Sequence, residues 1–246
     1  MSTLDPDRLP HHVAIIPDGN GRWAEKRGLT RMEGHRRGTE TIQELVRAAH
    51  ELGIRELTVY AWSQENWGRP TVEVNALMRL LHRYLRTHAD ELVENGIRLE
   101  TLGRIQELPA RVRRELERVQ RRTESFEEMR LNFALSYSGR TEIVDAVRRI
   151  ARAIESGQLD PEAIDEKAIG ANLYAPESTE PDLLIRTGAE HRISNYLLWQ
   201  LAYTELYFSD ALWPDFSKAD LVAALHEFQQ RQRRFGRTAQ QLQEET

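Results

Sequence analysis

The sequence contains no cysteine, and only three of its 34 basic residues are lysines. Without cysteine the chain forms neither disulfides nor thiolate metal sites, as is typical of proteins from a reducing compartment. Its apolar runs all fall short of the ~18 residues that indicate a membrane span. The opening residues, MSTLDPDRLPHH, lack the basic start and the apolar stretch of a secretory signal. We therefore expect a cytoplasmic protein.

The charge of the chain argues against nucleic acids as partners. The net charge is −5, and the arginines are scattered, with no basic block standing alone. Nucleic acids attract proteins through a concentrated positive surface, so general nucleic-acid binding is not expected. A local group of arginines around a small anionic molecule remains compatible with this composition.

Several familiar catalytic motifs are also missing. The absence of G-x-x-x-x-G-K-[ST] disfavours a P-loop nucleotide hydrolase, and the first apolar run is not followed by the G-x-G-x-x-G of dinucleotide-binding folds. The H-E-x-x-H motif of zinc proteases and the G-x-S-x-G turn of α/β-hydrolases do not occur either. Any chemistry must therefore come from another arrangement of residues.

Length and composition favour one domain. The chain has 246 residues, of which 40% are hydrophobic, and no linker rich in serine, glycine or proline divides it. We expect a single domain over residues 1–246, with flexible tails at 1–10 and 238–246.

Short apolar runs alternate with helical patterns along the chain. Strands are predicted at 13–16, 55–62, 96–103, 130–137, 182–187 and 205–208. Helices are predicted at 42–52, 74–95, 109–123, 143–154 and 219–232. Gly53 is a natural helix stop, and Thr71 is expected to cap the helix that follows it. The alternation predicts an α/β fold in which a mostly parallel sheet of about six strands has helices on both faces.

The chemically unusual residues follow three of the predicted strands, in segments 18–23, 63–69 and 186–194. In open parallel sheets, ligands bind beyond the carboxyl ends of the strands. Three loops that are distant in sequence would therefore meet at one crevice.

The first of these loops, in AIIPDGNGRW, combines a carboxylate, a cation and two glycines. Gly19 and Gly21 let the backbone approach a ligand closely, and Arg22 suits a phosphate group. Asp18 would repel a bare phosphate, but Mg²⁺ binds carboxylate and diphosphate oxygens together. The alternative is a simple turn in which Asp18 caps a helix.

The other stretches are less specific taken one at a time. EKRGLTRMEGHRRG supplies Arg31 and His35, and His35 alone would suit an ordinary surface position. AWSQENWGRP offers polar groups beside a tryptophan that could line a pocket or simply pack. The segment from 186 to 194 suits a second phosphate cradle, and Glu205 is either a second metal carboxylate or a plain edge-strand residue.

Taken together, these stretches resemble the cis-prenyltransferase family, the undecaprenyl diphosphate synthase-like isoprenyl transferases. DGNGRWA, GHRRG, ENWGRP, SYSGR, DLLIRTGAEHRISNYLLWQLAYTELYF and LWPDF occur in the family's order and spacing, over nearly the whole chain. No two aspartates are adjacent, which separates the chain from the all-helical trans-prenyl synthases.

The resemblance implies a homodimer with a hydrophobic tunnel in each subunit. It implies Mg²⁺-dependent condensation of isopentenyl diphosphate with an allylic diphosphate primer, farnesyl diphosphate being the expected one. The implied product is a polyprenyl diphosphate such as undecaprenyl diphosphate, delivered to a membrane with at most peripheral contact.

The resemblance also assigns roles to individual residues. Asp18 matches the catalytic, metal-linked aspartate, Asn66 a position assigned to proton removal, and Glu205 a metal position. The allylic diphosphate site is matched by Gly19, Asn20, Gly21 and Arg22, with Trp23, Arg31 and His35 beside them. The second-substrate loop is matched by Ser63, Trp67 and Arg69, and the isopentenyl diphosphate cradle by Arg186, Arg192 and Ser194. Arg234 and Gly236 match a C-terminal Arg-x-Gly.

Some residues depart from the family pattern. Pro17 stands where methionine is common, and SYSGR replaces the frequent NYGGR, but no charged site residue is lost. Two other functions stay open on the residues alone: a non-catalytic subunit that partners an active chain, and a phosphate-handling enzyme such as a phosphatase.

Overall fold

Six apolar runs of the sequence pair into one parallel sheet in the structure, a computed structural model that describes residues 4–231. Every neighbouring pair of strands is parallel, in the order β3-β4-β2-β1-β5-β6. The strands are β1 (His12–Ile16), β2 (Glu56–Ser63), β3 (Ile97–Leu102), β4 (Met129–Tyr137), β5 (Leu183–Arg186) and β6 (Glu205–Phe208). The predicted α/β fold with a parallel six-stranded sheet is confirmed.

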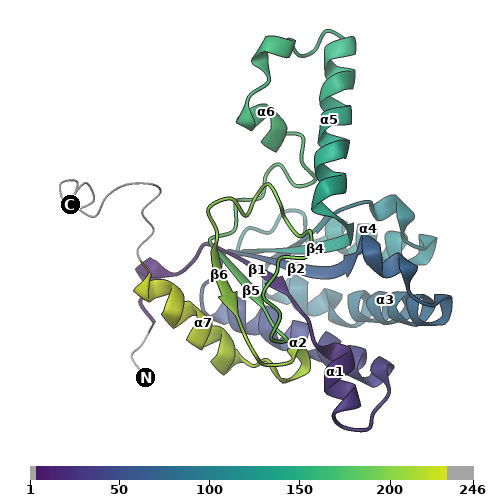
Figure 1. Cartoon of the computed structure of the whole chain (residues 1–246), viewed down its shortest axis with the longest axis vertical. Helices are drawn as coiled ribbons and strands as arrows, with labels where there is room; N and C mark the ends of the chain where they lie inside the picture. The colour runs from purple at the N-terminus through teal and green to yellow at the C-terminus, as the bar shows by residue number, and fades with distance from the viewer. Residues whose placement is uncertain (1–3, 232–246) are drawn as a thin grey trace.

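Seven α-helices connect and flank these strands in the described part of the chain (Figure 1). They are α1 (Asn20–Glu25), α2 (Arg31–Glu51), α3 (Thr71–Glu94), α4 (Ala110–Thr123), α5 (Gly139–Glu155), α6 (Glu166–Gly170) and α7 (Lys218–Gln230). Within residues 4–231, no helix combines the length and the apolar character needed to cross a bilayer.

Two predicted helix starts are wrong. The helix expected at 42 begins at Arg31, where Thr30 and Glu33 form a reciprocal capping box. Thr71 does not cap α3, because it is the first helical residue and Pro70 holds the cap position without a side-chain hydrogen bond. Gly53 does follow the end of α2, with a φ of 86° that suits glycine.

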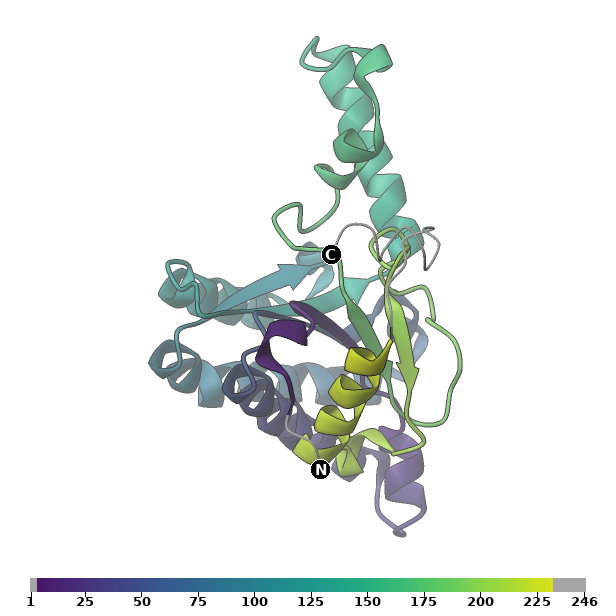
Figure 2. The same ribbon diagram turned by 90° about the vertical axis from the view of Figure 1, so that its left-hand side faces the viewer.

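The two faces of the sheet are covered differently. One face packs against α2, α3, α4 and α7 in the main apolar core. The other carries a smaller cluster in which Tyr60 stacks on Tyr196 with ring centroids 4.4 Å apart, covered by the connection between α6 and β6. Figures 1 and 2 show α5 and α6 projecting away from the sheet, so helices do not cover this second face as expected.

The N-terminal segment 4–10, expected as part of a flexible tail, lies against α7. Asp5 donates its backbone N–H to Gln229 Oε1 at 3.2 Å and accepts from Gln229 Nε2 at 2.6 Å. The other predicted tail, 238–246, lies outside the described residues.

The register of the strands places the carboxyl ends of β1, β5 and β6 side by side. Ile16 at the end of β1 lies beside Arg186 at the end of β5, and Arg186 lies beside Phe208 at the end of β6. The loops that follow β1 and β5 therefore begin next to each other.

Candidate active site

The turn after β1 is held by the start of the loop after β5. The Thr187 hydroxyl accepts a hydrogen bond from the Asp18 backbone N–H at 2.9 Å and donates to the Asp18 carbonyl at 2.8 Å. Gly19 has a φ of 111°, and a Cβ atom there would lie 2.9 Å from Leu212. Only glycine fits this turn without strain. Gly19 also holds the α1 cap position with no side-chain cap, so the alternative role of Asp18 as a helix cap is not observed.

Two arginines meet the Asp18 carboxylate. Arg186 Nη2 lies 2.9 Å from Asp18 Oδ2, and Arg22 Nη2 lies 3.4 Å from Asp18 Oδ1. Arg186 Nη1 donates to Ser194 Oγ at 2.7 Å and to the Arg192 carbonyl. With only 3% of its side chain exposed, Arg186 is a fixed link between the first and third predicted loops.

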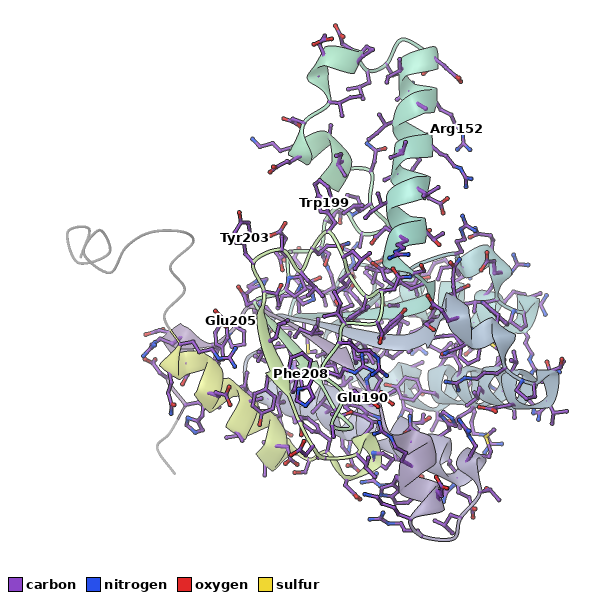
Figure 3. The ribbon with its side chains drawn as sticks, in the orientation of Figure 1. Arg152, Glu190, Trp199, Tyr203, Glu205 and Phe208 are labelled. Atoms are coloured by element: carbon purple, nitrogen blue, oxygen red, sulfur yellow. The ribbon has the colours of Figure 1, made fainter. Side chains whose placement is uncertain are left out.

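The surrounding charges favour an anionic ligand. Glu190, which is labelled in Figure 3, pairs with Arg22 at 3.6 Å and with Arg192. Arg31 lies over Gly21, with its Nε 3.5 Å from where a Cβ would stand. The guanidinium groups of Arg22, Arg186 and Arg192 thus pair with two carboxylates, Asp18 and Glu190, and Arg31 adds a fourth guanidinium group beside Gly21. The excess positive charge suits a diphosphate.

The second loop is tied to the third. Asn195 Nδ2 donates to Glu65 Oε1 at 3.0 Å, which connects the loop after β5 to the loop after β2. Within the second loop, Asn66 Oδ1 accepts from the Ser63 N–H at 3.3 Å. The three loops that the sequence singles out therefore converge.

Trp67 and Arg69 lie in the same short segment after β2, and both contact Trp62. Trp67 Nε1 donates to Ser136 Oγ at 2.8 Å, and its ring packs edge-on to Trp62. Arg69 pairs with Glu73 at 3.2 Å. Trp67 is thus partly a packing residue, while Arg69 presents its charge toward the cavity described below.

His35 is not a surface histidine. Only 15% of its side chain is exposed, and its Nε2 lies 4.0 Å from Glu73. Burial, with a smaller contribution from the charge of Arg69, lowers the pKa of His35 to about 4. The imidazole is therefore neutral at pH 7.

An apolar cavity of about 160 Å³ opens between the first and the second of these loops. Asn20, His35, Asn66 and Arg69 lie among its polar lining residues, and apolar side chains of α3 and β4 form the rest of its wall. Asn20 Oδ1, His35 Nε2 and Arg186 Nε are buried, with no hydrogen-bond partner in the described part of the chain. Buried polar atoms normally have a partner, so these three are suited to a ligand.

Not every predicted residue joins this group. Trp23 Nε1 donates to Asp215 Oδ1 at 2.7 Å, and Arg27 lies over the Trp23 ring, so Trp23 fastens α1 to the 212–216 segment. Glu205 lies at the start of β6 beside Leu183, at the opposite end of the strand from Arg186 (Figure 3). It pairs with Arg231 at 2.8 Å. Arg234 and Gly236 lie outside the described residues.

Asp18 is the predicted metal carboxylate that lies at this site. Residues 4–231 contain no group of three histidine, aspartate or glutamate side chains arranged to hold a metal. Mg²⁺, however, is commonly held by one or two carboxylates together with substrate phosphates and water. Asp18, beside guanidinium groups that would bind the same diphosphate, fits that manner of binding.

The sequence interpretation missed Thr187 and Glu190. Thr187 is fully buried behind the Asp18 turn, and Glu190 balances two of the arginines. Their types carry no specific signal, but both lie in the 186–194 segment that was already predicted to hold a phosphate.

Comparison with known proteins agrees with this geometry. Residues 16–236 match the family model described as putative undecaprenyl diphosphate synthase. The isoprenyl transferase of Heliobacterium mobile is 48% identical, over 95% of this chain and 90% of the relative. A ditrans,polycis-undecaprenyl-diphosphate synthase of Lactiplantibacillus plantarum, named as specific for (2E,6E)-farnesyl diphosphate, is also 48% identical, over 95% and 91%.

Solved structures share the fold. Lavandulyl diphosphate synthase from Lavandula x intermedia, solved in complex with dimethylallyl diphosphate, superposes with a TM-score of 0.91 at 39% identity, over 94% of this chain and 99% of that chain. A probable undecaprenyl diphosphate synthase from Campylobacter jejuni gives 0.76 at 32% identity, over 96% and 100%. The chain therefore belongs to the undecaprenyl diphosphate synthase family of isoprenyl transferases.

Proposed function

We propose that this isoprenyl transferase elongates an allylic diphosphate by adding isopentenyl diphosphate units with cis geometry. Farnesyl diphosphate is the proposed primer, and a polyprenyl diphosphate such as undecaprenyl diphosphate is the proposed product. The observation that carries the proposal is the pairing of two arginines with Asp18 close to an apolar cavity, whose lining includes the nearby Pro17 and Asn20. Family membership supports the class of reaction.

The reaction breaks the bond between the allylic carbon and its diphosphate while the isopentenyl alkene forms a new carbon–carbon bond. The barrier lies in charge separation, since an allylic cation develops as the diphosphate leaves. Arg22, Arg31 and the backbone N–H groups of the Gly19–Gly21 turn would stabilise the departing anion through charge and hydrogen bonds. Mg²⁺ held at Asp18 would add charge stabilisation to the same leaving group.

The second diphosphate would bind at Arg186, Arg192 and Ser194. Arg186 already joins the latter two, so the isopentenyl group would be held at a defined distance from the allylic carbon. Glu190 must release Arg22 and Arg192 as the substrates bind, because it occupies both guanidinium groups in the structure.

A proton then leaves the new intermediate. An amide is a poor base, so a diphosphate oxygen is the better acceptor, and Asn66 would position the path of the proton. Its side chain lines the cavity and is oriented by the Ser63 backbone.

We also propose a homodimer. Val144 and Val147 are 47% and 56% exposed on α5, the helix that projects from the sheet, and an unpaired apolar face of this kind suits a second copy. Val147→Glu should shift the sedimentation coefficient to that of a monomer. Val72→Glu, at a valine that is 80% exposed on α3, is the matched control and should not. A monomeric unmodified chain would refute the proposal.

We further propose that the protein works in the cytoplasm and delivers its product to a membrane by peripheral contact. Glu205 remains a proposed metal residue, although it is paired with Arg231 and distant from Asp18 within one chain.

The decisive experiment incubates the purified chain with radiolabelled isopentenyl diphosphate, Mg²⁺ and geranyl, farnesyl or geranylgeranyl diphosphate in separate reactions. Thin-layer chromatography then sizes the butanol-extractable product. We expect extractable product, with farnesyl diphosphate the best primer. No extractable product with any primer would favour a non-catalytic subunit, and release of inorganic phosphate instead of diphosphate would favour a phosphatase.

A further inference from the structure

The end of β4 carries contacts that the proposed mechanism does not use. The stretch SYSGR, residues 136–140, begins there and is the one that departs from the frequent NYGGR. Its first residue, Ser136, is 0% exposed and has a φ of 46°. Asparagine is enriched in this left-handed region, and serine is not. Backbone strain of this kind persists where neighbouring contacts hold the residue, so Ser136 is a candidate for a functional contact.

The Ser136 hydroxyl joins two side chains from different parts of the chain. It accepts a hydrogen bond from Nε1 of Trp67, in the second loop (residues 63–69), at 2.8 Å, and it donates one to Glu107 Oε2. A hydroxyl has one proton to donate, so the bond to Glu107 sets its direction and leaves the oxygen lone pairs for the indole. Glu107 therefore orients Ser136, and Ser136 orients Trp67.

Glu107 is itself anchored. Arg104 Nη1 lies 3.5 Å from Glu107 Oε1, and the same guanidinium group donates two hydrogen bonds of 2.9 Å to Asp145 on α5. The backbone N–H of Arg104 also donates to the Ser136 carbonyl at 3.2 Å. The turn after β3, which carries Glu107, is thus bound to the end of β4.

Two further side chains of the second loop are bound at the same strand end. Gln64 Oε1 accepts a hydrogen bond from Thr141 Oγ1 at 2.6 Å. Glu65 is linked to Ser138 through Asn195, whose Nδ2 lies 3.0 Å from Glu65 Oε1 and 2.7 Å from Ser138 Oγ. Three neighbouring positions of the loop are therefore fastened to the segment that follows β4.

The other polar side chains of the loop face the substrate site. Asn66 and Arg69 line the apolar cavity, and the fastened residues Gln64, Glu65 and Trp67 are not among the described residues that line it. The loop forms a tight 3₁₀ turn, in which the direction of one side chain constrains that of the next. Fastening the residues on both sides of Asn66 therefore sets where its amide points.

We propose that Ser136, oriented by Glu107, is a positioning residue of the active site. It holds the Trp67 indole, and through the loop it holds the Asn66 amide in the place that the proposed proton path requires. The inference rests on the proposed elongation activity. Neither Ser136 nor Glu107 is among the described residues that line the cavity, so both act through the loop.

The first test is the steady-state kinetics of the full-length chain with radiolabelled isopentenyl diphosphate. Ser136→Gly removes the hydroxyl, and glycine adopts a φ of 46° without strain, so this variant keeps the fold. It should lower kcat about fivefold, the value of one hydrogen bond, and change the KM for isopentenyl diphosphate less than about twofold. Ser136→Ala, which keeps the Cβ, should match it. A folded Ser136→Gly enzyme with wild-type kcat would overturn the inference and leave the proposed function standing.

Variants of Glu107 test the orienting role. Glu107→Ala removes the acceptor and should lower kcat as Ser136→Gly does. Glu107→Gln should stay near the wild-type kcat, because the amide carbonyl accepts the same hydrogen bond. A Glu107→Gln enzyme as impaired as Glu107→Ala would contradict the orienting role.

Thr123→Val is the matched control for loss of a buried hydroxyl. Thr123 is 0% exposed like Ser136, and its hydroxyl is hydrogen-bonded to the Leu99 N–H and to carbonyls of α4. The substitution should lower the temperature of thermal unfolding and leave kcat unchanged. An equal loss of kcat in Thr123→Val would show that general loosening is the cause, and would overturn the inference.

A double-mutant cycle measures whether Ser136 acts through the indole. Trp67→Phe keeps an aromatic ring and removes the N–H donor. In that background Ser136→Gly should lower kcat by less than about twofold further. Full additivity of the two substitutions would contradict the inference.

The indole N–H signal of Trp67 provides a readout that needs no turnover. The chain has five tryptophans, and Trp67→Phe identifies the signal by its loss from the NMR spectrum. Ser136→Gly and Glu107→Ala should shift this signal and speed up its exchange with water, and Thr123→Val should not. An unshifted signal would contradict the inference even in a chain that proved unable to elongate, an outcome that would separately refute the proposed function.

Discussion

Arg186→Lys tests whether the fork of one buried guanidinium organises the active site. The substitution keeps the positive charge, but an ammonium cannot reproduce the two-sided contact of Arg186 with Asp18 and with Ser194 and the Arg192 carbonyl. If lysine keeps the contact with Asp18, the two hydrogen bonds of Nη1 are lost. At about 1 kcal/mol each, the loss is about 2 kcal/mol, which corresponds to a fall of about thirtyfold in kcat/KM.

Steady-state incorporation of radiolabelled isopentenyl diphosphate measures this effect. Arg148→Lys is the matched control, because Arg148 is 60% exposed on α5 and, among residues 4–231, pairs only with the neighbouring Asp145. It should leave kcat/KM unchanged. A folded Arg186→Lys enzyme within about twofold of the wild type in kcat/KM would show that the fork does not hold the second substrate.

Three further outcomes follow from the same geometry. Gly34→Ala should destabilise the fold by about 1–3 kcal/mol in urea unfolding, because a Cβ there would lie 2.1 Å from the Asn20 carbonyl; Gly170→Ala, with open space around it, should not, and equal effects would refute the packing argument. The pKa of His35 is about 4 in the folded protein and 6.5 in the unfolded chain, so its contribution to folding stability is fully present above pH 6.5 and is lost as pH falls toward 4. His35→Asn should flatten that part of the stability–pH curve. An imidazole that titrates near pH 6.5 by NMR in the folded protein would contradict this prediction. Asn66→Ala should lower kcat at least about tenfold with little change in the KM for isopentenyl diphosphate, and near-normal turnover would exclude its role in the proton path.

The strands could be predicted from the sequence because each one is marked by its own short run of apolar residues. Runs such as Val13–Ile16 are buried on both sides, so they read as continuous apolar segments bounded by polar turns. Each predicted strand corresponds to an observed one within a few residues.

The first part of α2 was missed because its residues are mostly polar and include Gly34 and Gly38. Both glycines are required by the packing of α1 against α2. A Cβ at Gly38 would lie 2.0 Å from Asn20 Oδ1, so α1 can pack this close to α2 only if glycine occupies the position. The capping box of Thr30 and Glu33 was the signal that could have located the true start.

The site followed the sequence where residues lie next to strand ends. Asp18, Arg186 and Ser194 meet because β1 and β5 are neighbours, which the principle of convergent strand ends anticipates. Glu205 is the first residue of β6, and so it lies at the amino ends of the strands, away from the end where the loops converge. The pairing of Thr187 with Asp18 depends on strand order, which single-sequence periodicity does not specify.

The central claim is that diphosphate chemistry takes place around Asp18. The most direct measurement compares the wild type with Asp18→Asn for incorporation of radiolabelled isopentenyl diphosphate into butanol-extractable product, with farnesyl diphosphate, in Mg²⁺ and in EDTA. The account predicts that the wild type forms product in Mg²⁺ but not in EDTA. It predicts at least about a hundredfold less product in Mg²⁺ from a folded Asp18→Asn enzyme. Equal product from both enzymes, or undiminished product in EDTA, would contradict it.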